Sequence, residues 1–394
     1  LAIFLNFFGL PRSAPLVGLD GGQIWPAFID VHTHLDKGHI WPRADNVVGT
    51  LDGARAATTT DRAARWRHGD IERRFEFGLR CAYAHGTQAV RTHLDCMDLA
   101  QSEVSWAVFR ALRQRWAPRM VVQACSLTLL DGYATPDGQA LARLVADSGG
   151  VLGGITRLAK PDASPADMAA ALDNLFVTAK HHGLDIDLHV DETGDPAASA
   201  LAQVAGASLR RDFKGKVTCG HCCSLSVQSD EVAGRTIALC REAGLTVVSL
   251  PMVNQFLQGR IEGGTPRWRG VTLLRELAAG GVATAIASDN CRDPFFAFGD
   301  HDMLEVLEQA VRIGHLNGEF AAWPPAVGRI PAAAMDLPDA GEIRAGASAD
   351  LVLFRARSLS ELLSRPQADR VVLRGGRAID TTPPDYRELD DLFA

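Results

Sequence analysis

The sequence predicts an α/β protein, a (β/α)8 TIM barrel with a small β-sandwich-like domain formed by the two ends of the chain. Eight short apolar runs rich in β-branched residues recur along the middle of the chain, and amphipathic stretches of helical length separate most of them. Near-continuous apolar runs are typical of parallel strands buried on both faces, and parallel neighbours need helical crossovers. Beyond about residue 336 the pattern changes to short strands joined by turns.

In chain order, the predicted strands are residues 27–31, 88–92, 120–124, 151–155, 184–188, 216–219, 245–250 and 282–287. Helices are expected at residues 102–116, 164–182, 231–243 and 272–279, the last one ended by Gly280 and Gly281. The alternative architecture, a doubly wound open sheet, lacks support because no Gly-rich phosphate loop follows the first strand. We therefore place the barrel at residues 27–336 and the small domain at residues 1–26 and 337–394.

Composition and charge narrow the classes of function. Hydrophobic residues make up 47% of the 394 residues, so the chain can bury a large core. The formal net charge of −7 disfavours nucleic acid and anionic membranes as partners, and no apolar run approaches the ~20 residues of a membrane span. The eight cysteines lack the spacing of a disulfide framework, which predicts buried, reduced thiols in a cytoplasmic protein.

Ionisable side chains follow four of the predicted strands at their carboxyl ends, the face on which barrel enzymes carry their active sites. His32 and His34 end the first strand and, two residues apart, share one face of it. His189 follows the fifth strand, His221 the sixth and Asp289 the eighth. Each residue alone is more often structural, but their agreement across four strand ends predicts a site for zinc or iron.

Other residues of suitable type are weaker candidates. His93 and Asp95 end the second strand and either line the site or brace it. Cys222 and Cys223 are adjacent, so both seldom reach one ion, and we expect packing thiols there. Lys160 follows the fourth strand but lies in a loop typical of a solvent-facing lysine.

Six motifs occur in a fixed order along the chain. They are PAFIDVHTHLDK at 26–37, VRTHLD at 90–95, DLHVDE at 187–192, VNQFLQGR at 253–260, ASDN at 287–290 and GASADLVL at 346–353. With these motifs the chain resembles the amidohydrolase superfamily, and within it the bacterial cytosine deaminase-like group. The resemblance extends from about residue 20 to residue 380, and the last motif is similar to the family's composite β-domain signature.

The resemblance implies one divalent metal ion per subunit, zinc or iron, with four ligands: His32, His34, His189 and Asp289. It implies that metal-bound hydroxide attacks a ring carbon that bears an exocyclic amine, after which ammonia leaves. Glu192 would shuttle protons, His221 would orient or stabilise the hydroxide, and Asp289 would assist proton transfer. The residues support the role of Glu192, because a carboxylate three positions past His189 can lie over the ion without ligating it.

Two departures from the cytosine deaminases bear on the substrate. Those enzymes carry a glutamine near the third strand that pairs with the pyrimidine amide, whereas Leu127 lies near that position here. An unpaired amide costs about 1–3 kcal/mol, which disfavours cytosine itself. The cytosine deaminases also carry paired aspartates after the eighth strand, whereas Asp289 and Asn290 are more similar to the isopropylammelide amidohydrolases. The expected substrate is an amino-substituted N-heterocycle: a cytosine-like pyrimidine, a purine, a pterin or a triazine.

Four residues are candidate substrate contacts: Leu127, Asn290, Phe295 and Gln258. Phe295 either walls the pocket or belongs to the core of the last helix. Gln258 lies in the segment 254–270, which we expect over the barrel mouth. We also expect a homo-oligomer acting in nucleobase metabolism.

Two alternatives to deamination remain. One is release of an alkylamine from a triazine, or the opening of a cyclic amide. The other is a non-catalytic barrel that serves as a scaffold. The chain retains every proposed ligand and Glu192, which disfavours the scaffold. In a non-catalytic barrel nothing would maintain a costly cluster of ionisable groups.

Overall fold

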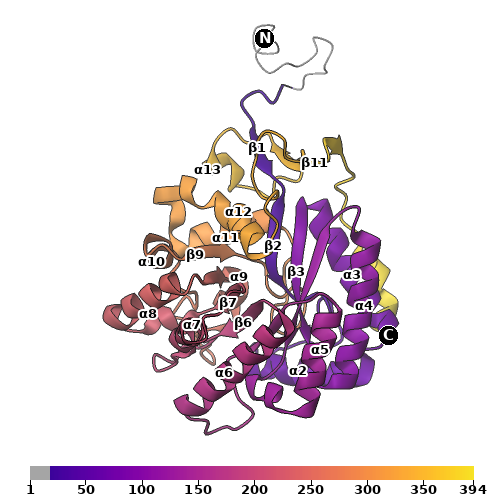
Figure 1. Cartoon of the computed structure of the whole chain (residues 1–394). Helices are drawn as coiled ribbons and strands as arrows, with labels where there is room; N and C mark the ends of the chain where they lie inside the picture. The colour runs from indigo at the N-terminus through magenta and orange to yellow at the C-terminus, as the bar shows by residue number, and fades with distance from the viewer. Residues whose placement is uncertain (1–17) are drawn as a thin grey trace.

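The computed structural model describes residues 18–394 and shows a barrel surrounded by helices (Figure 1). Two parallel sheets, one of three strands and one of five, form this barrel. The barrel strands are β2 (Phe28–Thr33), β3 (Thr87–Asp95), β4 (Val121–Leu127), β5 (Leu152–Ile155), β6 (Ile186–Val190), β7 (Val217–His221), β8 (Thr246–Ser249) and β9 (Ala283–Ile286). Each of the eight predicted strands overlaps one of them, so the predicted fold class is confirmed.

The barrel closes through short bridges between two parallel sheets, β2-β3-β4 and β5-β6-β7-β8-β9. Cys125 and Val151 bridge β4 to the start of β5, and Leu129 bridges to Ile155. Thr33, at the end of β2, bridges to Asp289 beyond β9. The first and last strands of the barrel therefore meet at a seam, which we define by the Thr33–Asp289 bridge.

Helices form the outer wall of the barrel, and most of them lie in the connections between consecutive strands. They are α2 (Leu51–Arg65), α3 (His68–Ala84), α4 (Leu99–Trp116), α5 (Pro136–Asp147), α6 (Pro165–His182), α7 (Ala200–Arg210), α8 (Asp230–Glu242), α9 (Pro251–Leu257), α10 (Leu274–Ala279), α11 (Met303–Gly314) and α12 (Arg329–Ala334). Short 3-10 helices add η1 (Leu130–Ala134), η2 (Cys223–Val227), η3 (Leu316–Ala322) and η4 (Pro324–Val327). The four predicted helices correspond to α4, α6, α8 and α10.

Local sequence explains where a helix such as α6 begins and ends. The Ser164 side chain accepts a hydrogen bond from the Asp167 backbone N–H, and the Asp167 carboxylate accepts one from the Ser164 backbone N–H. Pro165 stands at the first helical position, where its missing N–H costs nothing. Gly183 ends the helix with a φ of 65°, in the left-handed region that glycine enters without strain.

A second, antiparallel sheet joins the two ends of the described chain. Its strands are β1 (Gln23–Pro26), β10 (Leu351–Phe354), β11 (Val371–Arg374) and β12 (Arg377–Ala378), and α13 (Leu359–Leu362) lies between β10 and β11. Trp25, Val352, Phe354 and Val372 bury its inner face in one cluster with residues of α11. The sheet therefore packs on the barrel, next to the amino end of β2.

The last residues return to the barrel wall. Leu389 in η5 (Tyr386–Leu392) packs against Phe77 and Cys81 of α3, so the C-terminus lies beside the α3–α4 side of the barrel (Figure 1). The predicted domain boundaries, 1–26 with 337–394 and 27–336, stay a prediction, and residues 1–17 lie outside the described part. The predicted homo-oligomer is likewise untested.

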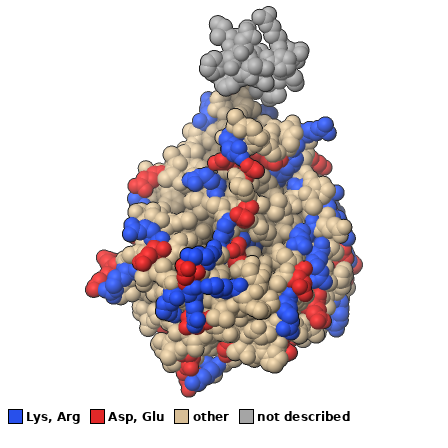
Figure 2. All heavy atoms as spheres, in the orientation of Figure 1, with Lys and Arg blue, Asp and Glu red and all other residues tan. Residues whose placement is uncertain are grey.

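The surface and the cysteines agree with the composition. All eight cysteines are free and buried, as predicted. Acidic and basic side chains are interspersed over the face shown in Figure 2. Within residues 18–394, no helix combines the length and apolarity that a membrane span requires.

Candidate metal centre and active site

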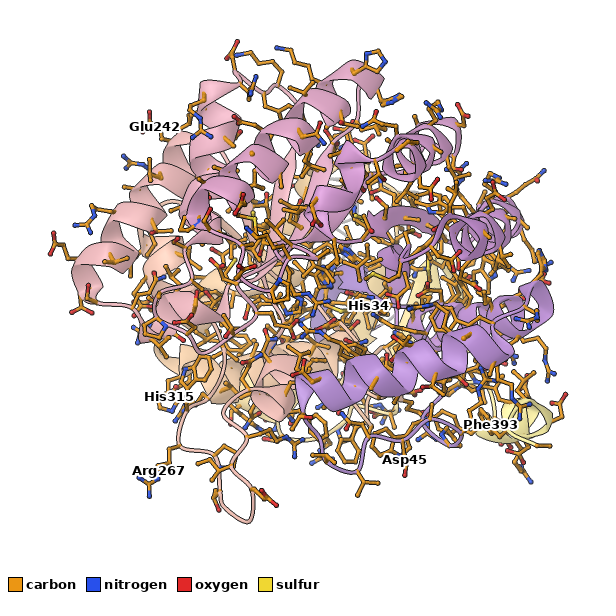
Figure 3. The ribbon with its side chains drawn as sticks, turned by 90° about the horizontal axis from the view of Figure 1, so that it is seen from below. His34, Asp45, Glu242, Arg267, His315 and Phe393 are labelled. Atoms are coloured by element: carbon orange, nitrogen blue, oxygen red, sulfur yellow. The ribbon has the colours of Figure 1, made fainter. Side chains whose placement is uncertain are left out.

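Four predicted metal ligands meet at the carboxyl end of the barrel. The ligand atoms of His32, His34, His189 and Asp289 all lie within 4.8 Å of one another. Nε2 of His34 is 3.2 Å from Oδ1 of Asp289 and 3.2 Å from Nε2 of His189, and Nε2 of His32 is 3.6 Å from the same Asp289 oxygen. Seen along the barrel from below, His34 lies near the centre of the ring of helices (Figure 3).

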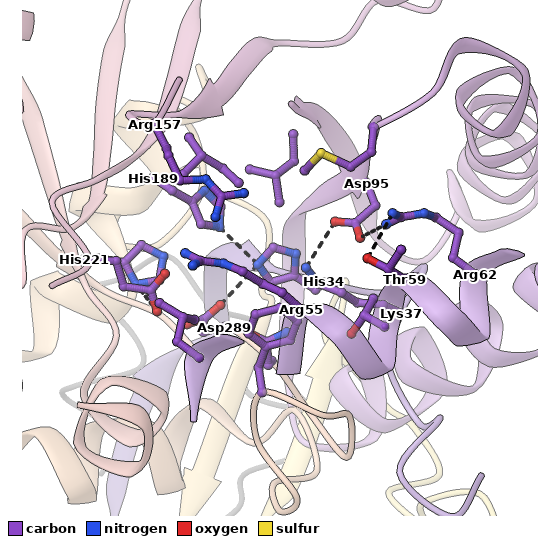
Figure 4. Close-up of a pocket in the computed structure, with 18 residues that line it drawn as sticks. His34, Lys37, Arg55, Thr59, Arg62, Asp95, Arg157, His189, His221 and Asp289 are labelled. Atoms are coloured by element: carbon purple, nitrogen blue, oxygen red, sulfur yellow. Dashed lines mark hydrogen bonds and ion pairs between the residues drawn. The ribbon is translucent and has the colours of Figure 1, made fainter. Parts of the chain in front are cut away.

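The seam of the barrel positions this cluster. The Asp289 backbone N–H donates to the His32 carbonyl at 2.8 Å, and the Thr33 hydroxyl donates to the Asp289 carbonyl at 2.9 Å. Asp289 has a φ of 68°, a left-handed turn that directs its carboxylate toward the histidines (Figure 4). Beneath it, the Ser288 hydroxyl and backbone N–H both donate to the Asp30 carboxylate. Backbone pairing therefore holds the ligands from β2 and β9 in register.

The cluster has the properties of a site for a cation. Both ring nitrogens of His32 and both carboxylate oxygens of Asp289 lack hydrogen-bond partners in the described part of the chain. A buried polar group without a partner costs about 1–3 kcal/mol. Burial holds the pKa values of His32, His34 and His189 well below the usual histidine value, so their rings are neutral and their lone pairs are free. Three imidazoles and one carboxylate fit a divalent transition metal such as zinc or iron.

Next to this cluster, Glu192 and His221 face each other. Nδ1 of His221 is 3.7 Å from Oε1 of Glu192 and 4.0 Å from Oδ2 of Asp289. Burial lowers the pKa of His221, and the nearby Glu192 carboxylate opposes that shift. The amide nitrogen of Asn254 donates to Nδ1 of His221 at 3.0 Å. The imidazole thus lies between two carboxylates, where it can interact with negative charge.

A pocket opens over the cluster, and three of the four predicted substrate contacts line it. Leu127 and Phe295 contribute apolar surface, together with other apolar side chains from several elements: Leu51, Met97 and Ile155. Phe295 also packs on the cluster around Val253 of α9 and not on the cluster that contains α11, so of its two expected places the structure shows the pocket wall. The Asn290 amide lines the pocket while it donates to Asp293 at 2.7 Å.

Gln258 lies elsewhere. It is buried, is not among the residues that line the pocket, and its amide donates to the Glu192 carbonyl at 3.3 Å. Gln258 therefore contacts the backbone of Glu192 and does not contact the pocket. The segment around it carries Arg267 at the periphery of the molecule (Figure 3).

His93 and Asp95, which sequence analysis left undecided, separate in the structure. The His93 ring stacks on His32 with centroids 3.9 Å apart, and its Nε2 lies 3.7 Å from Asp187, which pairs with Arg91 at 2.9 Å. His93 is buried beneath the ligands and braces them. Asp95 lines the pocket.

The weaker cysteine and lysine candidates behave as expected. Cys222 and Cys223 are fully buried. Lys160 is exposed and lies 3.7 Å from Asp167.

Sequence analysis missed the basic side chains of the pocket. Lys37 is buried and pairs with Asp95 at 3.1 Å, and Arg62 pairs with the other oxygen of Asp95 at 2.9 Å. Arg55 and Arg157 extend over the predicted metal ligands (Figure 4). Arg157 follows the fourth predicted strand by two residues, a strand-end position that could have revealed it. Arg55 lies on α2, which the sequence pattern did not identify.

The comparisons with known proteins cover nearly the whole chain. Residues 84–380 match the amidohydrolase family. The chain is 52% identical to a pterin deaminase from Rhizobium rhizogenes strain K84, over 97% of this chain and 86% of that protein. It is 24% identical to N-isopropylammelide isopropyl amidohydrolase from Pseudomonas sp. strain ADP, over 72% and 67% of the two chains. The fold matches 5-methylcytosine deaminase from Klebsiella pneumoniae with a TM-score of 0.82 and 24% identity, over 93% and 90% of the two chains.

Proposed function

The chain belongs to the amidohydrolase family, and on that premise we propose that it removes an amino group as ammonia from a pterin ring. That it is a hydrolytic deaminase of an N-heterocycle follows from its similarity to a deaminase at 52% identity over almost its full length. The same similarity is the observation that carries the choice of a pterin. Leu127 in the pocket is consistent with a ring other than cytosine, as the sequence predicted.

The proposed ligand set is His32, His34, His189 and Asp289. A divalent ion held there supplies an activated water molecule as the nucleophile. Glu192 is the residue we assign to proton transfer, because its carboxylate faces His221 and stands outside the ligand set. It accepts one proton from the attacking water at Oε1 and delivers it to the ring nitrogen beside the amine-bearing carbon.

His221 and Asp289 complete the proposed mechanism. Once the water oxygen is bonded to the ring carbon and gives up its second proton, negative charge develops on that oxygen, and His221 is placed to stabilise it. Oδ2 of Asp289, 4.0 Å from His221, is placed to pass the second water proton to the leaving amine. The carbon–nitrogen bond then breaks, and the products are ammonia and a ring carbonyl.

The basic residues specify the substrate further. Arg157 is exposed at the pocket and forms no ion pair with an acid in residues 18–394, whereas Arg55 pairs with Asp52 at 3.0 Å. Partial desolvation and the nearby charge of Arg55 lower the pKa of Arg157, and Asp52 opposes that shift. Two guanidiniums in one pocket repel each other unless an anion lies between them. We therefore propose that the preferred pterin carries an acidic substituent, such as a carboxylate, directed toward Arg55 and Arg157.

The test is ammonia release by the zinc- or iron-loaded chain from pterin, a carboxylated pterin, guanine, adenine, cytosine and ammelide. The expected result is the highest kcat/KM with the carboxylated pterin, and little activity with cytosine. Activity confined to a purine or a triazine would refute the pterin assignment. N-isopropylammelide is assayed alongside for alkylamine release. That release, with no ammonia from any ring, would instead favour the isopropylammelide reaction, which the presence of Asn290 in the pocket keeps as the second candidate.

A further inference from the structure

A second group of metal-ligating side chains lies apart from the proposed active-site ligands. His39, Cys291 and His301 place one nitrogen or sulfur atom each within 4.8 Å of one another. Their side chains come from the loop after β2 and from the loop after β9. All three are buried, with 1%, 2% and 3% of their surface exposed. None of them lines the active-site pocket.

The histidines of this group lack the hydrogen bonds that buried imidazoles need. Neither ring nitrogen of His39 has a partner among residues 18–394, and neither has Nε2 of His301. Nδ1 of His301 lies 3.4 Å from the Thr33 hydroxyl, so Nε2 is the atom left free. Native proteins rarely leave buried polar groups unpaired, so these nitrogens point to a bound species outside the polypeptide.

The backbone holds the group in place across the seam. The His39 N–H donates to the Cys291 carbonyl at 3.1 Å, beside the Thr33–Asp289 bridge. His39 and His301 have φ values of 62° and 55°, a left-handed conformation uncommon for residues other than glycine. Strained backbone of this kind persists where surrounding structure requires it, often at ligand sites.

The absence of a side chain at Gly78 leaves room for the His301 ring. Gly78 of α3 lies against it, and a methyl group at Gly78 would stand 3.1 Å from Nε2 of His301 and 2.7 Å from Leu35. The helix therefore approaches the free nitrogen closely without blocking it.

We propose that His39, Cys291 and His301 bind a second divalent metal ion, which ties the loop after β2 to the loop after β9. Two imidazoles and one thiolate are donors that zinc prefers, and they supply three of the four ligands that it takes. The thiol proton of Cys291 passes to solvent when the ion binds. Since the same two loops contain His34 and Asp289, this ion stabilises the seam on which the active site depends.

The first experiment counts metal in the full chain. The chain is reconstituted with zinc, freed of loosely bound ions, and analysed by inductively coupled plasma mass spectrometry. Cys291→Ala is expected to retain one equivalent fewer than the wild type. Cys240→Ala, a matched change at a buried cysteine of α8, is expected to retain the wild-type content.

The second experiment identifies the ligands. X-ray absorption at the zinc edge is expected to show sulfur at about 2.3 Å in the wild type and in Asp289→Ala, and none in Cys291→Ala. The active-site ligand set contains no sulfur, so this signal reports on the second site alone. Because neither measurement needs substrate, a failed deaminase assay would not affect the outcome.

Absence of zinc–sulfur scattering in the reconstituted wild type would overturn the proposal and leave water as the partner of His39 and His301. Equal zinc contents of Cys291→Ala and the wild type would also overturn it. If Cys291→Ala does not fold, the wild-type spectrum decides the question alone.

Discussion

Replacing Glu192 by glutamine separates proton transfer from metal binding. The side chain keeps its size and loses its ability to accept a proton, and it stands outside the group of ligand atoms formed by His32, His34, His189 and Asp289. In the proposed mechanism this one carboxylate makes both transfers, from water and to the ring nitrogen. General acid–base catalysis contributes about 10²–10⁴-fold, and the double role places the expected loss of kcat in the upper part of that range, about 10³–10⁴-fold.

That loss corresponds to about 4–5.5 kcal/mol of activation free energy. Ammonia release is followed continuously with a coupled glutamate dehydrogenase assay, and metal is counted by mass spectrometry on the same preparation. Glu231→Gln, an exposed change on α8, serves as the matched control and should leave kcat unchanged. A loss below tenfold in Glu192→Gln, or a parallel loss of metal and rate, would refute the assignment.

Four further predictions concern the metal, the pocket and pH. Chelation should abolish ammonia release and lower Tm, and added zinc or iron should restore both; retained activity in the metal-free chain would contradict the site. Arg157→Ala should raise KM at least tenfold for a carboxylated pterin and much less for pterin, measured by initial rates; equal effects would exclude an anion contact. Lys37→Met should lower the free energy of unfolding by about 3 kcal/mol in urea titrations, because one oxygen of the buried Asp95 carboxylate loses its cation while the other still pairs with Arg62. A change under about 1 kcal/mol would contradict a stabilising role of the Lys37–Asp95 pair. Burial raises the pKa of Asp30 from 3.8 to about 6, so the folded state holds the Asp30 proton more tightly than the unfolded state does. The resulting contribution to stability is fully present below pH 3.8 and is lost as the pH rises through 6. Asp30→Asn should therefore flatten the pH dependence of unfolding between pH 4 and 6, and an unchanged slope would exclude Asp30 as its source.

Local pattern was sufficient wherever side-chain periodicity and strand order determine position. His32 and His34 share a strand face because alternate residues of a strand point the same way. His189, His221 and Asp289 end other strands, and the parallel strands of a barrel bring their carboxyl ends to one rim. The close approach of these residues was therefore predictable before any distance was known.

Long-range geometry was not predictable in this way. Gln258 sits in a segment that sequence places at the barrel mouth, yet its side chain turns inward to the Glu192 backbone. His93 and Asp95 are two residues apart on one strand, but one braces the ligands and the other lines the pocket. Side-chain direction at a strand end depends on what packs around it, and a one-dimensional pattern does not contain that information.

Periodicity, strand order and short motifs were enough to predict the barrel, the family and the residues gathered at its rim. Which distant residues meet depends on how the closed fold brings its segments together. Arg55 and Arg157 are about a hundred residues apart in the sequence and line one pocket. His39 follows the first barrel strand, yet it lies beside Cys291 and His301, which follow the last one. The physical reason is that the barrel closes. When β2 pairs with the residues after β9, segments far apart in the sequence come into contact, and no local sequence pattern predicts that contact.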